Sequence, residues 1–272
     1  MSEKGGAPEV EVARTGFGAA SDAVIARRFL ALLDLTELTD SCTESSIDQL
    51  VARAVAPQGK VAAVCLWPQF VKQARAALVG TGVKIATVMN FPGGNADIGR
   101  VVDDIQDALA DGADEIDIVM PYRAFLAGDE EIARALLRAA RRHVSTTHRL
   151  KVILETGAYS DLALVAKATR LAVEEGADFV KTSTGKSAIS ATLSAAEAML
   201  QVIRSTGASV GLKPSGGIRT LADARPYLEL ADRLMGIAWA SPETFRIGAS
   251  GLHSALIAAI DGAPAAHPAG GY

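Results

Sequence analysis

The chain has 272 residues and a formal net charge of −4, and 49% of its residues are hydrophobic while 5% are aromatic. Its length suits a single eight-stranded α/β barrel, which needs about 250 residues, and its apolar content excludes disorder over the whole chain. The acidic balance argues against a binder of nucleic acid or of an anionic membrane surface, and no apolar run reaches the roughly 18 residues of a membrane span.

The cysteines and the N-terminal residues indicate the cellular compartment in which the protein is expected. Cys42 and Cys65 are the only cysteines, and neither belongs to a CxxC motif or a Cys/His cluster. We therefore expect neither a disulfide framework nor a structural zinc site. Because residues 1–20 lack the apolar stretch of a signal peptide, a cytoplasmic location is expected.

Taken in chain order, the pattern begins with a flexible lead at residues 1–20, which are rich in Gly and Ala. Ser21 or Asp22 can cap the amphipathic helix that follows. After this helix, short apolar runs alternate with stretches of helical spacing, which is typical of repeated βαβ units. Strands are expected at 32–36, 61–66, 83–89, 114–119, 150–155, 177–182, 209–213 and 244–248, and the helices include 97–110, 130–147, 161–175 and 192–206.

Glycine marks three junctions between a helix and the next strand. Gly112, Gly176 and Gly207 stand at these junctions, and glycine there can adopt the left-handed conformation that ends a helix. Eight βα units in about 240 residues favour a closed barrel over an open sheet, and no GxGxxG turn follows the first strand. We expect one TIM (β/α)8 barrel over residues 21–260, with an extra N-terminal helix and a mobile tail at 261–272. Segment 232–238 is either an additional strand or the end of a helix.

Two lysines at the ends of consecutive strands are the strongest chemical signal. The active site of such a barrel gathers at the carboxyl ends of its strands. Of nine lysines, Lys181 and Lys213 stand there, on neighbouring strands. With strands roughly 4.8 Å apart, the two amines are expected about 5 Å from each other. Their repulsion at an effective dielectric constant of 20 is then about 3 kcal/mol, or roughly two pKa units.

Desolvation lowers the pKa of a lysine in the same direction. One amine is therefore expected to approach neutrality near pH 7, as an amine that attacks a carbonyl carbon must. For either lysine alone, a solvent-facing strand end is the simpler interpretation. The pair, within its surrounding motifs, favours catalysis.

Glycine-rich turns close to these lysines indicate a phosphate site. Lys181 opens KTSTGK at 181–186, and Lys213 opens KPSGGIRT at 213–220. The segment GAS at 248–250 leads into the last helix, whose N-terminus favours negative charge. Loops after the seventh and eighth strands are the usual phosphate site of this barrel. A Gly-Gly pair alone is more often a plain turn.

Six motifs give the chain a resemblance to a known family. They are LDLT at 33–36, AAVCLWP at 62–68, GADEIDIVMPY at 112–122, DFVKTSTGK at 178–186, GLKPSGGIRT at 211–220 and RIGAS at 246–250. From about residue 25 to 260 the chain resembles the deoxyribose-phosphate aldolases, a class I (Schiff-base) family. The resemblance implies reversible cleavage of 2-deoxy-D-ribose 5-phosphate to D-glyceraldehyde 3-phosphate and acetaldehyde. It implies no cofactor and no metal, because a Schiff base itself delocalises the developing carbanion.

The resemblance also implies roles for individual residues. Lys181 would form the Schiff base, Lys213 would tune its pKa and assist proton transfer, and Asp117 would relay protons through bound water. Tyr272 resembles a terminal tyrosine that reaches the active site in several family members; an inert terminus is the alternative. Gly251 departs from relatives that often carry a second serine there. The implied substrate-binding residues are Asp34, Thr36, Cys65, Thr182, Gly185, Lys186, Gly216, Gly217, Gly248 and Ser250.

Some placements stay open in the pattern. Period-two alternation puts Glu115 and Asp117 on one face of their strand but does not say which face is inward, so the role of Asp117 depends on the resemblance. Asp114 and Glu115 are expected to face outward or to lie at the junction. Cys65 either lines the acetaldehyde side or is a small core residue.

Two other functions fit parts of the sequence. A different barrel enzyme acting on sugar phosphates, either another Schiff-base aldolase or an isomerase, would share the phosphate loops. A non-catalytic sugar-phosphate sensor would bind without turnover, but it would not need a perturbed amine. The expected partners are the small-molecule substrate and products and a second copy in a homodimer, with no nucleic acid and no membrane.

Overall fold

Eight parallel strands form the centre of the molecule in this computed structural model, which describes residues 21–263. Each predicted strand is present, although most are shorter than their apolar runs. The strands are β1 Leu33–Glu37, β2 Ala63–Leu66, β3 Lys84–Met89, β4 Glu115–Val119, β5 Arg149–Ile153, β6 Phe179–Lys181, β7 Gly211–Lys213 and β8 Ile247–Ala249.

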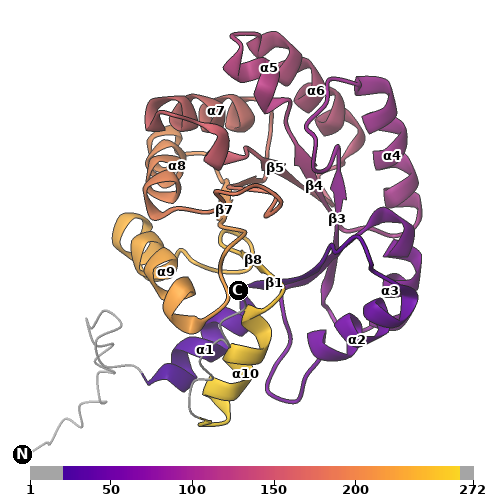
Figure 1. Cartoon of the computed structure of the whole chain (residues 1–272), viewed down its shortest axis with the longest axis vertical. Coiled ribbons are helices and arrows are strands. Elements are labelled where there is room, and N and C mark those ends of the chain that lie inside the picture. Colours follow the sequence, from indigo (N-terminus) through magenta and orange to yellow (C-terminus); the bar gives the residue numbers. More distant parts are fainter. Residues whose placement is uncertain (1–20, 264–272) are drawn as a thin grey trace, which may run out of the picture.

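The sheet closes on itself into a barrel. Hydrogen-bonded neighbours follow the order β7-β6-β5-β4-β3-β2-β1-β8, so strands adjacent in sequence are adjacent in space, and β8 pairs with β1. On the remaining side, parallel bridges join Leu212 to Phe245 and Ser215 to Gly248. The backbone N–H of Gly248 donates to the carbonyl of Pro214 at 2.9 Å. The predicted (β/α)8 barrel with an extra helix before β1 is confirmed (Figure 1).

Helices surround the barrel (Figure 1). The additional helix α1 (Asp22–Ala31) packs against α10 (Leu252–Ile260), so the first and last helices of the described chain lie side by side. Two short 3₁₀ helices, Pro68–Phe70 and Thr156–Ala158, follow β2 and β5. The α-helices are α1 Asp22–Ala31, α2 Glu44–Ala54, α3 Val71–Leu78, α4 Ile98–Ala110, α5 Tyr122–Leu126, α6 Glu130–His143, α7 Leu162–Glu174, α8 Leu193–Thr206, α9 Leu221–Met235 and α10 Leu252–Ile260.

Two of the boundaries differ from the sequence predictions by three or more residues, and the structure decides between the two alternatives at 232–238. Helix α6 ends at His143 rather than near 147, because the Ser145 hydroxyl bonds to Thr147 Oγ1 at 2.8 Å and to His148 Nδ1 at 2.9 Å in a local turn. Segment 232–238 is the end of a helix, since α9 runs to Met235 and Gly236 follows with φ 96°. The last strand begins at Ile247 rather than near 244, because Thr244 and Phe245 both bond back to the Ser241 carbonyl in a turn.

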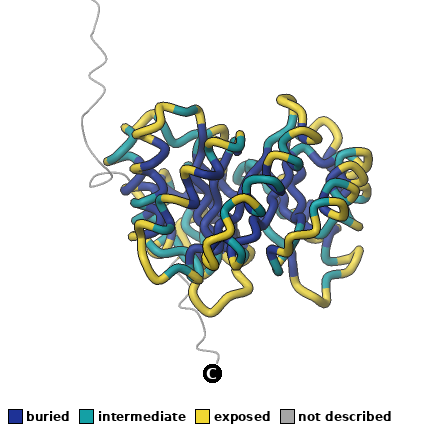
Figure 2. Tube along the Cα trace, turned by 90° about the horizontal axis from the view of Figure 1, so that it is seen from above, coloured by how far each residue is buried: buried dark blue, intermediate teal, exposed yellow. Residues whose placement is uncertain are grey.

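The helix ends confirm the predicted glycines, whereas Ser21 stands at the N-cap of α1 without a side-chain cap hydrogen bond. Gly112, Gly176 and Gly207 have φ of 102°, 86° and 65°, which confirms that these junctions need glycine. Thr192 caps α8 by accepting from the N–H of Ala195 at 3.2 Å. Apolar helix faces and outward strand faces form the main core, and Figure 2 shows the buried chain at the centre of the molecule. No helix of residues 21–263 is long and apolar enough to cross a membrane.

Candidate active site

A pocket of about 270 Å³ opens at the carboxyl ends of the strands, as expected for this barrel. It brings together eight of the predicted site residues, which are Thr36, Lys181, Gly185, Lys186, Gly216, Gly217, Gly248 and Ser250. Sequence reasoning did not single out the rest of its lining, which is Glu37, Leu38, Thr39, Thr184, Ser215, Ile218, Arg219 and Ala249. Of these, Arg219 was within reach of the sequence, because it lies in the KPSGGIRT motif.

The glycines of this pocket are required by geometry. Gly185, Gly216 and Gly217 have φ of 79°, 86° and 80°, a region that residues with a Cβ rarely occupy. A Cβ on Gly216 would lie 2.6 Å from Ser190 Cβ and 3.0 Å from Gly185 Cα. The loops after β6 and β7 therefore approach each other here. Helix α10 starts after Gly251 without a side-chain cap, so its first turn offers backbone N–H groups suited to an anion.

Side-chain bonds hold the loop after β6 in place. The Ser215 hydroxyl donates to the Ser183 carbonyl at 2.5 Å. The Thr184 hydroxyl donates at 2.6 Å to Oε2 of Glu155, which lies two residues after β5. Glu155 is itself buried in a left-handed conformation with φ 58°, so the backbone accepts a strained residue to place this carboxylate under the loop.

Lys181 and Lys213 face each other across neighbouring strands. They are paired in the register of β6 and β7. Both ammonium groups contact the same oxygen of Asp117, Oδ2, at 2.8 Å and 2.7 Å. The two nitrogen atoms are thus at most about 5.5 Å apart, the sum of these two distances. This agrees with the expected 5 Å spacing, but a carboxylate stands between the amines.

Asp117 and Glu115 both point into the barrel. The expectation that Glu115 faces outward is wrong, because its side chain is 2% exposed and contacts Lys151 Nζ at 2.5 Å. Its inward position follows from the period of the strand, since Asp117 lies two residues on. Asp114, which precedes β4, does lie at the junction and pairs with Arg75 at 2.5 Å.

Two buried cations were missed in the sequence. Lys151, on β5, is fully buried and contacts Asp117 Oδ1 at 2.8 Å, Glu115 at 2.5 Å and Asp34 at 3.5 Å. Arg246, just before β8, contacts Asp34 Oδ1 at 2.6 Å and Glu115 Oε1 at 2.9 Å. The available signal for Lys151 was a charge in the middle of the apolar run LKVILE, at the position that faces Asp117 in the parallel register.

The seven charged residues form one connected cluster, here called the interior cluster, which consists of Asp34, Glu115, Asp117, Lys151, Lys181, Lys213 and Arg246. Fully ionised, it carries four cations and three carboxylates, hence one positive charge in excess. An excess charge away from water is costly, and loss of one proton removes it. Arginine keeps its proton in proteins, so a lysine must lose it.

The contacts indicate which lysine that is. Lys151 contacts three carboxylates, Lys213 contacts Asp34 at 2.5 Å as well as Asp117, and Lys181 contacts Asp117 alone. Burial lowers the pKa of Lys181, with Asp117 opposing and Lys213 adding to the shift. For Lys213, burial is outweighed by Asp117 and Asp34, so its pKa is raised. The direction expected for Lys181 is thus present, but burial rather than repulsion by Lys213 is its main cause.

The carboxylates of the cluster stay ionised. Burial alone would raise the pKa of Asp117, but Lys151, Lys181 and Lys213 outweigh it and hold that pKa well below its ordinary value. The pKa of Asp34 is likewise lowered, because Lys213 and Arg246 overcome the effect of burial. Within residues 21–263, no group of three or more His, Cys, Asp and Glu is arranged to hold a metal ion.

The other predicted residues lie beneath the pocket or outside the described chain. Asp34 is fully buried in the interior cluster. Cys65 is fully buried among Leu38, Ala86 and Val88, burial raises the pKa of its thiol, and it does not line the pocket. Thr182 does not line the pocket, and its hydroxyl donates to the Ser215 carbonyl at 3.2 Å and accepts from the Ser215 N–H at 3.0 Å. Tyr272, the lead at 1–20 and most of the tail lie outside the described residues.

An ion pair crosses the mouth of the pocket. Lys186 Nζ, on the loop after β6, contacts Asp40 Oδ1 at 3.1 Å, on the loop after β1. The Asp40 side chain is 89% exposed and that of Lys186 is 35% exposed. Lys186 therefore lies at the surface with a counter-ion that water surrounds.

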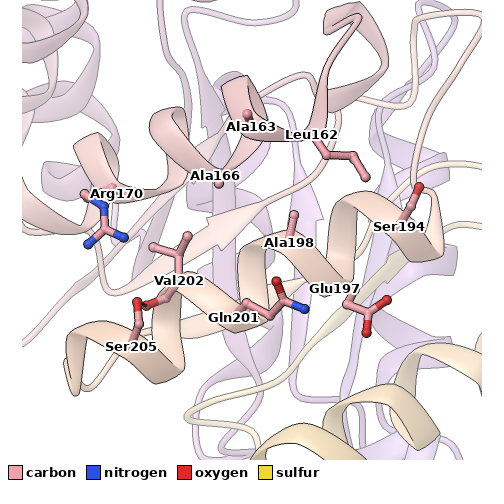
Figure 3. A pocket seen from close by; sticks show the side chains of 10 residues that line it. All are labelled: Leu162, Ala163, Ala166, Arg170, Ser194, Glu197, Ala198, Gln201, Val202 and Ser205. Carbon is pink, nitrogen blue, oxygen red and sulfur yellow. Dashed lines mark hydrogen bonds between the residues drawn. The ribbon is translucent and has the colours of Figure 1, made fainter.

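A second hollow lies on the outside of the barrel. It has a volume of about 540 Å³ and lies between α7 and α8 (Figure 3). Its lining is Leu162, Ala163, Ala166, Arg170, Ser194, Glu197, Ala198, Gln201, Val202 and Ser205. This lining contains neither a lysine nor a cysteine nor a histidine. The groups suited to carbonyl chemistry are in the barrel mouth.

Comparisons with known proteins agree with this site. The family model described as DeoC/LacD family aldolase matches residues 28–241. The deoxyribose-phosphate aldolase of Agrobacterium fabrum is 50% identical over 244 residues, which cover 89% of this chain and 94% of the relative. A crystal structure from Coccidioides immitis has a TM-score of 0.76 at 30% identity and covers 87% of this chain and 86% of its own. One from Toxoplasma gondii has a TM-score of 0.82 at 26% identity, with 89% and 98% covered. Both are provisionally assigned as deoxyribose-phosphate aldolases.

Proposed function

The chain belongs to the DeoC/LacD family of aldolases, and on this premise we propose that it cleaves 2-deoxy-D-ribose 5-phosphate reversibly to D-glyceraldehyde 3-phosphate and acetaldehyde through a Schiff base on Lys181. The observation that carries the proposal is the position of Lys181. It lines the pocket, and it is the lysine with the fewest carboxylate contacts in a buried cluster that has one cation too many.

The neutral Lys181 amine starts the reaction by attacking the aldehyde carbon C1 of the open-chain sugar, and loss of water gives the imine. Removal of the proton from the C3 hydroxyl then breaks the C2–C3 bond. The bonding electrons flow into the protonated imine, which gives an enamine and releases D-glyceraldehyde 3-phosphate. Protonation of the enamine carbon and hydrolysis of the imine release acetaldehyde and restore Lys181.

Asp117 and Lys213 are the proposed proton carriers. Asp117 touches both lysines through one oxygen, so a proton leaving one group has an acceptor within hydrogen-bond distance. Because the pKa of Lys213 is raised, Lys213 stays a cation. It can therefore supply a proton or stabilise negative charge next to the reacting carbon without competing for the aldehyde.

The phosphate group is assigned to the glycine-rich loops of the pocket. Gly185, Gly216, Gly217 and the start of α10 offer backbone N–H groups there. Lys186 and Arg219 add positive charge to the same lining. Gly251 in place of a second serine leaves a backbone N–H for the phosphate, so the site is expected to remain functional.

Reductive trapping tests the proposal. The full chain is incubated with acetaldehyde and sodium borohydride, and the modified residue is located by mass spectrometry of peptides. We expect an ethyl group on Lys181 and none after Lys181→Leu, together with loss of deoxyribose 5-phosphate cleavage. Lys167→Leu is the matched control, because Lys167 lies on α7 with its side chain 54% exposed. An adduct on another lysine, or none, would contradict the assignment.

The homodimer and the cytoplasmic location expected from the sequence stay predictions. Light scattering on the purified chain tests the dimer. A mass corresponding to one copy, 28.2 kDa, would contradict it. Cell fractionation tests the location.

A further inference from the structure

Arg246 and Glu115 are the members of the interior cluster that lie farthest along the strands from the pocket. Glu115 is the first residue of β4, and Arg246 directly precedes β8, whereas Lys181 and Lys213 are the last residues of their strands. Neither Arg246 nor Glu115 lines the pocket. Both are 2% exposed, so their charges are hidden from water.

Arg246 binds two carboxylates at once. Its guanidinium contacts both oxygens of Glu115, at 2.9 Å and 3.3 Å, and Oδ1 of Asp34 at 2.6 Å. The opposite oxygen of Asp34 thereby faces Lys213 at 2.5 Å. In the same way, Glu115 Oε2 faces Lys151 at 2.5 Å. The planar fork of the arginine fixes the two acids that in turn hold two of the three buried lysines.

Strands β1, β2, β4, β5 and β7 and the residue before β8 contribute titratable groups to the surroundings of Lys181. Strand β3 contributes Ala86 and Val88 to the apolar cluster near Cys65. The titratable and charged groups are Asp34 on β1, Cys65 on β2, Glu115 and Asp117 on β4, Lys151 on β5, Lys213 on β7 and Arg246 before β8. The charge of the cluster is therefore distributed around the whole barrel interior.

We propose that Arg246 and Glu115 are positioning residues for the reaction. They hold Asp34 and Lys151 in place, and their opposite charges balance, so that the interior cluster keeps one positive charge in excess and Lys181 is the group that gives up a proton. This inference rests on the proposed Schiff-base function of Lys181. Its physical basis is that Arg246 cannot lose its proton, while Lys151 and Lys213 are each held by at least two carboxylates.

The proposal predicts shifts of opposite sign for the two residues. Arg246→Met removes a positive charge, so the cluster is neutral with every lysine protonated, and Lys181 should hold its proton to higher pH. Glu115→Gln removes a negative charge and should release that proton at lower pH. A unit charge about 10 Å away at an effective dielectric constant of 20 corresponds to roughly one pH unit.

The experiment measures the rate of imine trapping against pH. Each full-length variant is treated with acetaldehyde and sodium cyanoborohydride between about pH 5 and 9, where amine protonation governs the attack, and the ethyl group on Lys181 is quantified by mass spectrometry. We expect the midpoint to rise by about one pH unit in Arg246→Met and to fall by a similar amount in Glu115→Gln. In the double variant, which restores the excess of one charge, the midpoint should return to that of the unmodified chain.

Charge-conserving variants are the matched controls. Arg246→Lys and Glu115→Asp perturb the packing but keep the charge, so they are expected to lower the rate without moving the midpoint. An unchanged midpoint in Glu115→Gln, a midpoint in the double variant that differs from that of the unmodified chain, or shifts of the same sign in both single variants would overturn the inference. If Arg246→Met does not fold, Glu115→Gln and the double variant decide. Absence of any adduct on Lys181 in the unmodified chain would instead refute the proposed function.

Discussion

Gly248→Ala tests how tightly Lys213 is held. Gly248 lies on β8 beside Asp34, and a Cβ there would be 3.0 Å from Lys213 Cε and 2.8 Å from Ser215 Cβ. Both separations are shorter than ordinary van der Waals contact. Lys213 cannot swing away freely, because its ammonium group is bound to Asp117 at 2.7 Å and to Asp34 at 2.5 Å. The added methyl must therefore lengthen these contacts or push Ser215 outward.

The expected magnitude follows from overpacking. Extra atoms in a closely packed interior cost about 1–3 kcal/mol, which corresponds to a fall in Tm of roughly 4–8 °C for a cost near 2 kcal/mol in a chain of this size. Displacement of a catalytic group by a fraction of an ångström lowers turnover by about 10- to 100-fold. The loss should appear in kcat, because Lys213 is a proposed proton carrier; a rise in KM alone would mean that the methyl group only crowds the pocket, which Gly248 itself lines.

The assay combines calorimetry with cleavage of deoxyribose 5-phosphate. Gly99→Ala is the matched control, because a Cβ on Gly99 of α4 meets nothing nearer than 3.8 Å. It should leave both Tm and turnover at or above the original values, since alanine favours a helix. If Gly248→Ala matches this control in kcat, then Lys213 has room to move and the argument from its two short contacts is wrong.

Three further predictions follow from the buried charges and the chain end. Lys151→Met leaves three carboxylates without a shared cation, so we expect a loss of about 3–5 kcal/mol in unfolding free energy by denaturant titration; a loss below about 1 kcal/mol, as for a surface pair, would contradict its role in the cluster. The pKa values of Asp34 and Asp117 are lowered in the fold. Below about pH 4 the unfolded chain therefore binds protons that the folded chain does not bind, and the free energy of unfolding decreases as the pH is lowered. Asp117→Asn should make this decrease less steep, and urea titrations that show the same slope for the variant and the original chain would contradict the prediction. Deletion of Tyr272 should slow turnover or hydrogen exchange at the acetaldehyde carbon while leaving Tm intact; unchanged kinetics would identify an inert terminus.

The fold was largely predictable because its signals are local. Apolar runs, helical spacing and glycines at the helix ends identified eight strands and their order, and the register then placed Lys181 beside Lys213. Boundaries were less predictable where polar side chains bond to nearby groups, as Ser145 does after α6. Such side-chain hydrogen bonds compete with the helix, but they produce no periodic pattern of apolar residues in the sequence.

The rim of the site was predictable from the sequence and its interior only in part, since Asp34, Asp117 and Lys213 were named as site residues but their other charged partners were not. The glycine-rich loops could be identified in the sequence, because a backbone with positive φ requires glycine. Glu115, Lys151 and Arg246 were misplaced or missed, because a buried charge is acceptable only when its partners are present. Those partners come from β1, β4, β5 and the start of β8, so the pairing becomes visible only once the barrel is closed.

The ion pair of Lys186 with Asp40 has a consequence for how an anion enters. Between such solvated partners the attraction amounts to about 1 kcal/mol or less, while a phosphate dianion offers twice the charge of a carboxylate. An arriving phosphate can therefore replace Asp40 as the partner of the Lys186 ammonium group at little energetic cost, because the Asp40 carboxylate is already surrounded by water. In the absence of phosphate, Asp40 neutralises Lys186 at the mouth of the pocket through a weak ion pair. Raising the ionic strength should weaken this exposed pair before it affects the buried interior cluster.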